Sequence, residues 1–120
     1  MIGADLSGRR VLVTGASSGI GLATVEIFAR NGAAVALNHL PDDPRGPAEA
    51  ARLAGTGLSV LALPGDVSRA GEAEAMVAAG IDSLGGLDVL VNNAGTSGST
   101  TPIAFEDLDA MSEDFWATIL

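Results

Sequence analysis

The hydrophobic positions of the chain form four short, nearly continuous runs. Runs of this length, rich in Val, Leu and Ala and closed by glycine, proline or polar residues, are typical of strands buried on both faces of a sheet. The first run reads RRVLVTG and the last lies within GGLDVLVNNAG. The pattern therefore predicts strands at residues 9–15, 33–38, 58–64 and 87–91.

The segments between these runs carry apolar residues at helical spacing instead. The first segment ends at an Asn-Gly pair, a common helix stop, and its apolar positions are Ile20, Ala23, Ile27 and Phe28. The third segment has its apolar stripe at Ala73, Val77, Ile81 and Leu84. The spacing predicts helices that end near residues 30, 54 and 84, the second of them beginning at 48 after a turn-rich loop over 41–47. A further helix is expected after Ser112, following a loop over residues 96–102.

Strand and helix thus alternate along the chain. This order implies βαβ units with right-handed crossovers and one parallel sheet, which is an α/β fold. A length of 120 residues suits one compact domain, and an apolar content of 48% is enough for a buried core. We therefore interpret residues 1–120 as belonging to a single domain.

Composition narrows the classes of function. The net charge of −9, without a cluster of basic residues, disfavours nucleic acids and anionic membranes as partners. The chain has no Cys, which excludes disulfides and thiolate metal sites. It shows no apolar run long enough for a membrane span and no signal-peptide pattern, so a cytoplasmic location is expected. No metal site is predicted.

The polar and glycine-rich segments follow the predicted strands. In parallel α/β sheets, ligands bind outside the carboxyl ends of the strands. The segments that should meet at this edge are 14–21, 38–43, 64–67 and 92–98. They carry small or polar residues, which predicts a binding site there.

The first of these segments reads TGASSGIG. Gly15 permits a tight turn out of the strand, and Gly19 and Gly21 permit close approach of backbone to a ligand and of helix to strand. The free N–H groups of the following helix, with the hydroxyls of Ser17 and Ser18, favour a pyrophosphate. A glycine-rich turn without a ligand is the alternative interpretation of this motif taken alone.

Together with GDV at 65–67 and NNAG at 92–95, this motif resembles the short-chain dehydrogenase/reductase (SDR) family. The resemblance runs from about residue 6 to the end of the sequence, and LGGLDVLVNNAG is similar to the family's lead into its NNAG signature. It implies a Rossmann-type doubly wound parallel sheet, of which this chain holds the first four strands. It also implies an oxidoreductase that transfers hydride between a nicotinamide and a carbonyl or alcohol carbon.

The resemblance also implies roles for particular residues. The adenine amino group is expected at Asp66, beside the backbone of Val67, although the alternative for Asp66 is an acid at a helix N-terminus. Asn92 is expected to support the structure between strands. The phosphates and the nicotinamide ribose are expected along Ser17, Ser18 and Ile20, and the adenosine ribose along Asn93, Ala94 and Gly95.

The choice between NAD and NADP depends on the residue that ends the second strand. An acid there binds the ribose 2′-hydroxyl of NAD and repels a 2′-phosphate. In this chain the position holds His39, a predicted loop residue near the ribose rather than a catalytic base, so the sequence favours NADP over NAD. Arg45 is a candidate for a 2′-phosphate, whereas Asp42 and Asp43 would oppose one if the loop folds back.

The chain contains no Tyr and no Lys. Family members use a Tyr-x-x-x-Lys pair and a Ser, because the substrate oxygen needs a general acid whose pKa is tuned by a cation. Ser97 and Ser99 come too early to match that Ser, and the family's helical Asn, seven residues after a Trp like Trp116, would fall at position 123. We therefore expect the domain to be incomplete at its C-terminal end and these 120 residues alone to be inactive.

Two functions fit these observations. The first is an enzyme that acts on a small-molecule carbonyl or alcohol, with its catalytic half outside these residues. The second is a non-catalytic dinucleotide-binding module or regulatory subunit. The resemblance further implies a homo-oligomer, a tetramer or a dimer, of the full-length protein.

Overall fold

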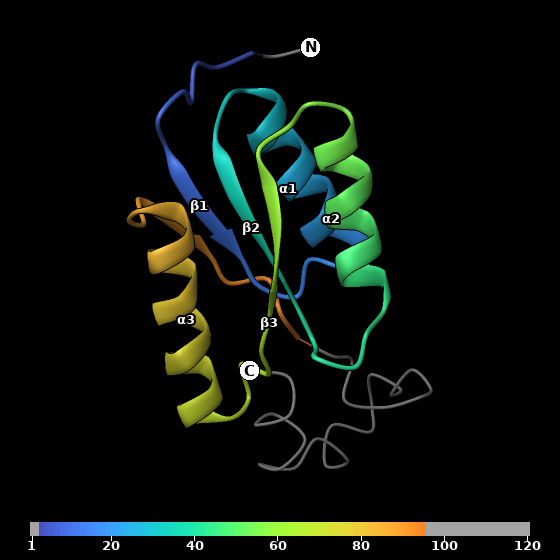
Figure 1. Ribbon diagram of the computed structural model, residues 1–120, viewed down its shortest axis with the longest axis vertical. Helices are drawn as coiled ribbons and strands as arrows, with labels where there is room; N and C mark the ends of the chain where they lie inside the picture. Colours follow the sequence, from blue (N-terminus) through green and yellow to red (C-terminus); the bar gives the residue numbers. More distant parts are fainter. Residues whose placement is uncertain (1–2, 96–120) are drawn as a thin grey trace, which may run out of the picture.

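The computed structural model describes residues 3–95 and shows a parallel sheet flanked by helices (Figure 1). The predicted alternation is confirmed over this range. The elements in chain order are β1 (Arg10–Val13), α1 (Gly19–Arg30), β2 (Ala34–His39), α2 (Arg45–Gly55), β3 (Val60–Pro64), α3 (Ala70–Leu84) and β4 (Val89–Val91). The loop expected at 96–102 and the helix expected after Ser112 lie outside the described residues.

The strands are parallel and follow the order β3-β2-β1-β4. The chain therefore steps outward from β1 to β3 and then returns to the other side of β1 with β4. In the register of the central strands, Val11 pairs with Val35 on one side and with Val89 on the other. This order is one half of a doubly wound sheet, and its switch point lies at the carboxyl ends of β1 and β4.

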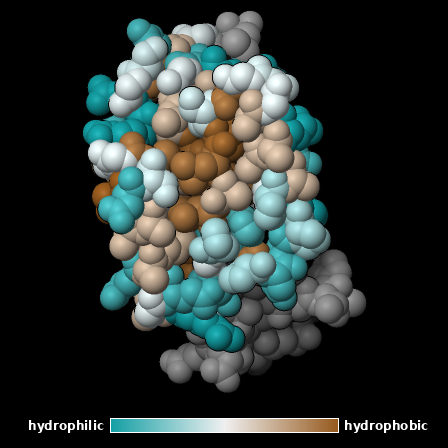
Figure 2. Space-filling view, in the orientation of Figure 1, coloured by the Kyte–Doolittle hydropathy of each residue, from teal (hydrophilic) through white to brown (hydrophobic). Residues whose placement is uncertain are grey.

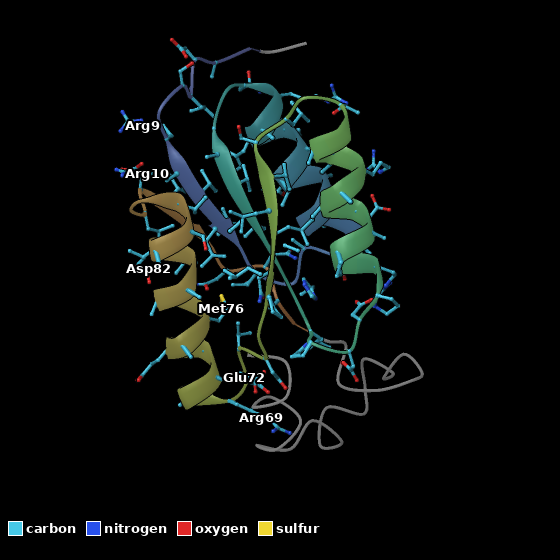
Figure 3. All side chains as sticks on the ribbon, in the orientation of Figure 1. Arg9, Arg10, Arg69, Glu72, Met76 and Asp82 are labelled. Carbon is cyan, nitrogen blue, oxygen red and sulfur yellow. The ribbon has the colours of Figure 1, made fainter. Side chains whose placement is uncertain are left out.

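Helices cover both faces of the sheet, with α1 and α2 on one side and α3 on the other (Figure 1). Side chains alternate along each strand, so Val11 and Val13 pack toward α1 and α2 while Leu12 packs toward α3. The side facing α3 has its own, second core, formed by Leu12, Ala36 and Leu63, and Met76 reaches into it from α3 (Figure 3). Burial on both faces explains why β1 and β2 are apolar at almost every position.

The edge strand β3 is less buried than the central strands β1 and β2. Apolar side chains gather on the surface between α3 and α2 (Figure 2), where β3 contributes the half-buried Val60, Leu61 and Ala62. Within residues 3–95, no helix is long and apolar enough to cross a membrane.

The predicted inner face of α1 is mostly wrong, because only Phe28 of its four apolar positions packs against the core. The buried residues of this helix are Gly21, Val25 and Ala29. Ile20 and Ile27 are exposed instead, by 81% and 62%. Small residues four positions apart let the helix lie close to the sheet, so packing selects this stripe over the bulkier one.

The predicted stripe of α3 is only partly right. Val77 and Leu84 pack against the second core, but the buried positions are Met76 and Gly80, and Ile81 is exposed.

Helix α2 begins at Arg45, three residues before the predicted start. The three prolines in PDDPRGP suggest a loop, yet Pro44 is the N-cap and Pro47 lies in the first turn. Proline is tolerated there because the first N–H groups of a helix have no partner within it.

Candidate functional site

The β1–α1 loop meets the carboxyl ends of the neighbouring strands β2 and β3 through one buried side chain, that of Asn38. This residue lies in β2 and is 2% exposed. Its Oδ1 accepts a hydrogen bond from the Gly15 backbone N–H at 3.1 Å. Its Nδ2 donates to the carbonyl oxygens of Leu63 and Gly65, both at 3.1 Å. One amide therefore fixes the glycine-rich loop, β2 and the end of β3 relative to one another.

Gly15 and Gly19 both have a left-handed backbone, with φ of +57° and +60°. At Gly15 a Cβ would lie 2.7 Å from the Cα of Ala94, so the two chain segments are in close contact there. At Gly19 a Cβ would have no atom within 4 Å. The absence of a side chain at residue 19 therefore leaves open space beside the start of α1, where a ligand can reach the backbone.

The N-terminus of α1 lacks a side-chain cap, as does that of α2. Ser18 is the N-cap of α1 and is exposed, but its hydroxyl makes no capping hydrogen bond. The first turn holds no acidic residue. The N–H groups of this turn and the positive end of the helix dipole are thus left for an anion, which matches a pyrophosphate. Ile20 projects from the same turn and is 81% exposed.

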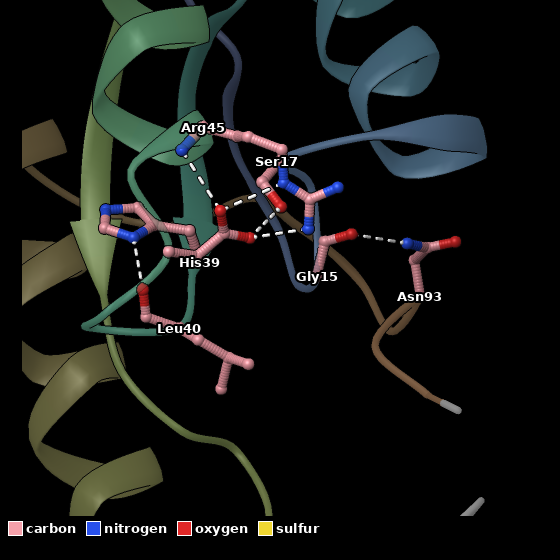
Figure 4. Close-up of polar contacts among 7 residues, drawn as sticks. Gly15, Ser17, His39, Leu40, Arg45 and Asn93 are labelled. Carbon is pink, nitrogen blue, oxygen red and sulfur yellow. Dashed lines mark hydrogen bonds and ion pairs between the residues drawn. The ribbon is translucent and has the colours of Figure 1, made fainter. Parts of the chain in front are cut away.

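The segment after β4 lies against this loop through Thr14 and Asn93. The Thr14 hydroxyl oxygen accepts hydrogen bonds from the backbone N–H groups of Asn93 and Ala94, each at 3.0 Å. Asn93 Nδ2 donates to the carbonyl oxygen of Thr14 at 3.2 Å. It also donates to that of Gly15 at 3.0 Å (Figure 4). Asn92 is exposed within residues 3–95, and Asn93 is the residue that joins this segment to the β1–α1 loop. Gly95, the last described residue, is exposed at the same edge.

Asp66 and Val67 follow β3 at the same edge of the sheet. Asp66 Oδ1 accepts hydrogen bonds from Ser68, at 2.6 Å from the hydroxyl and 3.0 Å from the backbone N–H. These bonds lower the pKa of Asp66, so its carboxyl is ionised at neutral pH. The backbone N–H of Asp66 donates to Glu72 of α3 at 2.9 Å. Asp66 itself lies before the N-cap Arg69, and the acid in the first turn of α3 is Glu72. Asp66 Oδ2 lies 3.7 Å from Arg69 Nε.

The chain after β2 turns back onto the glycine-rich loop. Ser17 Oγ donates to Asp43 Oδ2 at 2.8 Å, and Arg45 Nη2 donates to the same oxygen at 2.9 Å (Figure 4). Arg45 and Ser17 hold the pKa of Asp43 well below its usual value. The contact brings an anionic side chain next to a residue predicted to bind the ligand.

His39 is the last residue of β2 and not a loop residue. It is 4% exposed, and its Nδ1 donates to the Leu40 carbonyl oxygen at 2.7 Å (Figure 4). A Cβ at Gly46 would overlap its ring, so His39 packs beneath the first turn of α2. Its place at the end of the second strand agrees with the prediction. The sequence did not predict that its side chain is buried.

The structure thus gathers the predicted residues at one edge of the sheet, on loops that follow all the described strands. Thr14 and Asn38 were not predicted as site residues. Asp43 was expected to oppose a 2′-phosphate if its loop folds back, and the loop does fold back onto Ser17. The signal for Asn38 was available, because a polar side chain within an apolar strand requires buried hydrogen-bond partners. The arrangement can bind an elongated anionic ligand through backbone N–H groups.

Comparison with known proteins agrees with this geometry. The family model described as short chain dehydrogenase matches residues 9–119. The 3-oxoacyl-[acyl-carrier-protein] reductase of Chlamydia pneumoniae is 38% identical over 115 residues, which are 96% of this chain and 44% of that protein. The L-rhamnose 1-dehydrogenase (NAD(P)(+)) of Sphingomonas sp. (strain SKA58) is 42% identical over 92 residues, 75% of this chain and 35% of that protein.

Solved structures show the same likeness. A short chain dehydrogenase from Burkholderia cenocepacia J2315, determined in complex with NADP, superposes with a TM-score of 0.72 at 36% identity and covers 89% of this chain and 44% of that one. The chain therefore spans less than half the length of these relatives.

Proposed function

The chain belongs to the short-chain dehydrogenase family, and we propose that the whole protein is an NAD(P)-dependent oxidoreductase whose nucleotide lies on the glycine-rich loop. The observation that carries this proposal is the open, uncapped start of α1 beside Gly19. A pyrophosphate needs free N–H groups and room for close approach, and this turn offers both.

We assign the remaining contacts by position along the edge of the sheet. The adenine lies toward Asp66 and Val67, at the end of β3, and the adenosine ribose lies toward His39, at the end of β2. The phosphates are proposed to bind the backbone groups of Gly15, Ser17, Ser18, Gly19, Ile20 and Gly21. The adenosine ribose is proposed to be lined by Asn93, Ala94 and Gly95.

When bound, the nicotinamide gives or takes a hydride. The residues of this chain bind and orient the nucleotide. The proposed substrate is a small molecule with a carbonyl or alcohol group. Since these 120 residues hold no Tyr and no Lys, we propose that the proton donor is supplied by other residues of the whole protein and that this chain alone does not turn over substrate.

Two observations bear on the form of the cofactor. The absence of an acid at position 39 favours NADP, the nucleotide in the Burkholderia structure. The named activity of the rhamnose dehydrogenase relative includes both NAD and NADP. The proposed cofactor class is therefore NAD(P), and the proposed assembly is a dimer or a tetramer, as the resemblance implies.

The substitution Gly19→Ala tests the proposed site. The added methyl group meets no protein atom, so its only structural cost is a left-handed backbone at a non-glycine residue, roughly 1–2 kcal/mol. The methyl group does, however, occupy the space proposed for the nucleotide. We expect the full-length variant to lose no more than about 1–2 kcal/mol of unfolding free energy in urea and to bind NADPH and NADH at least tenfold more weakly in fluorescence titrations.

Gly8→Ala is the matched control. Gly8 has φ of +80°, and a Cβ added there would also have no atom within 4 Å, but Gly8 precedes β1 at the opposite edge of the sheet. This variant should carry a similar cost in stability and bind both nucleotides as the wild type does. Equal binding by the two variants would refute the proposed site. Binding without turnover of any carbonyl or alcohol substrate by the full-length protein would support a non-catalytic module instead.

A further inference from the structure

The segment between β2 and α2 places one carboxylate against the glycine-rich loop. Asp43 follows Gly21 by 22 residues, and its side chain is only 13% exposed. The Ser17 hydroxyl donates to its Oδ2 at 2.8 Å. Asp43 is therefore a fixed part of this edge of the sheet, although it lies four residues beyond the end of the strand.

The charge of the Asp43 carboxylate is neutralised by Arg45, whose exposed side chain a ligand can displace. Arg45 donates from Nε to Oδ1 at 3.0 Å and from Nη2 to Oδ2 at 2.9 Å. Its side chain is 63% exposed, in contrast to that of Asp43. The backbone N–H of Arg45 also donates to Oδ1 at 3.0 Å. Together with the bond from Ser17, these hydrogen bonds fill the acceptor positions of the Asp43 carboxylate. A ligand group can reach Asp43 by displacing the exposed guanidinium.

The two forms of the nucleotide meet this pair differently. A ribose 2′-hydroxyl is neutral and can donate to Asp43 in place of Arg45. A 2′-phosphate carries up to two negative charges and can pair with Arg45 only if Arg45 leaves Asp43. The carboxylate then stays unneutralised beside the phosphate, because its hydrogen bonds to Ser17 and to the Arg45 backbone hold it in place.

We propose that Asp43 is the residue that selects the cofactor, making NAD the preferred nucleotide over NADP, and that Arg45 is its displaceable counter-charge. This assignment rests on the proposed function, since it requires the nucleotide to lie on the glycine-rich loop. It replaces the preference for NADP that residue 39 favours by itself, because the acid is supplied by a returning loop and not by the strand end.

The test is a fluorescence titration of the full-length protein with NADH and with NADPH. The wild type should bind NADH more tightly. Asp43→Asn removes the repulsion and releases Arg45, so its affinity for NADPH should rise roughly tenfold while its affinity for NADH stays within about threefold. Arg45→Gln should weaken binding of NADPH alone. The double variant should lose the gain in NADPH affinity that Asp43→Asn shows.

Asp42→Asn is the matched control. It removes the same charge from an exposed neighbouring position, so its ratio of NADH to NADPH affinity should stay within about twofold of the wild type. A wild type that prefers NADPH, or a ratio that Asp43→Asn leaves unchanged while both nucleotides bind, overturns the assignment alone. Failure of the wild type to bind either nucleotide overturns the proposed function and the assignment with it.

Discussion

At the scale of single residues, Asn38 contributes most to the geometry of the site. It satisfies the Gly15 N–H and the carbonyl oxygens of Leu63 and Gly65 from one buried position. A buried amide in this role is specific, since each partner would otherwise be left without a hydrogen bond. The position of Gly15 relative to the end of β3 thus depends on one side chain.

Asn38→Asp is expected to destabilise the full-length protein by about 2–4 kcal/mol in urea unfolding. The substitution keeps the shape but replaces the amide donor by a carboxylate oxygen that faces two carbonyl oxygens. Protonation of the new carboxyl restores one donor, so the destabilisation should be smaller at about pH 4 than at pH 7. A penalty below about 1 kcal/mol at neutral pH would show that these hydrogen bonds contribute little.

At the scale of the elements, α1 shows how packing chooses one face of a helix. Its buried stripe of Gly21, Val25 and Ala29 lies against β1 and β2, and the bulkier Ile27 faces away. The close approach also brings Gly21 next to the backbone of Gly15 and the side chain of Asn93. The face that packs on the sheet therefore also aims the start of the helix at the site.

Val25→Ala and Ile27→Ala measure which face is buried. Val25 is fully buried, so its truncation should cost about 2 kcal/mol in the free energy of unfolding of the full-length protein. Ile27 is 62% exposed, so its truncation should change that free energy by less than about 0.5 kcal/mol. Equal costs, or the reverse order, would contradict the packing described for α1.

At the scale of the whole molecule, an ion pair joins the beginning of the described chain to its end. Arg10 in β1 lies against the turn after α3 (Figure 3) and donates from Nε to Asp88 Oδ2 at 3.1 Å. Asp88 Oδ2 also accepts from the backbone N–H of Arg10 at 2.9 Å. These bonds fix the entry of β4 beside β1, and so fix the point where the strand order reverses.

This link makes a prediction about pH. The hydrogen bonds from Arg10 lower the pKa of Asp88 in the folded protein. The stabilisation is therefore complete above the unfolded pKa, near 3.8, and is lost as pH falls below it. We expect Asp88→Asn to be less stable than wild type at about pH 6 and the difference to shrink toward about pH 2 in urea unfolding. A difference that grows on acidification would contradict this assignment.

The amino-acid sequence by itself determined the elements and the place of the site. The four apolar runs mark the described strands, and in β1 and β2 burial on both faces demands apolar residues at successive positions. TGASSGIG marks the turn proposed to bind phosphate, because bare backbone there has a local steric cause. Both signals are short-range, so a linear pattern is enough to show them.

Only the tertiary structure decided which faces and which partners are used. The buried stripe of α1, the returning contact of Asp43 with Ser17 and the bonds of Asn93 to Thr14 and Gly15 join residues up to 79 positions apart or depend on the sheet beneath them. Spacing along the chain shows that a side chain is polar or apolar. Which atoms it meets depends on how the strand order folds distant segments to one edge.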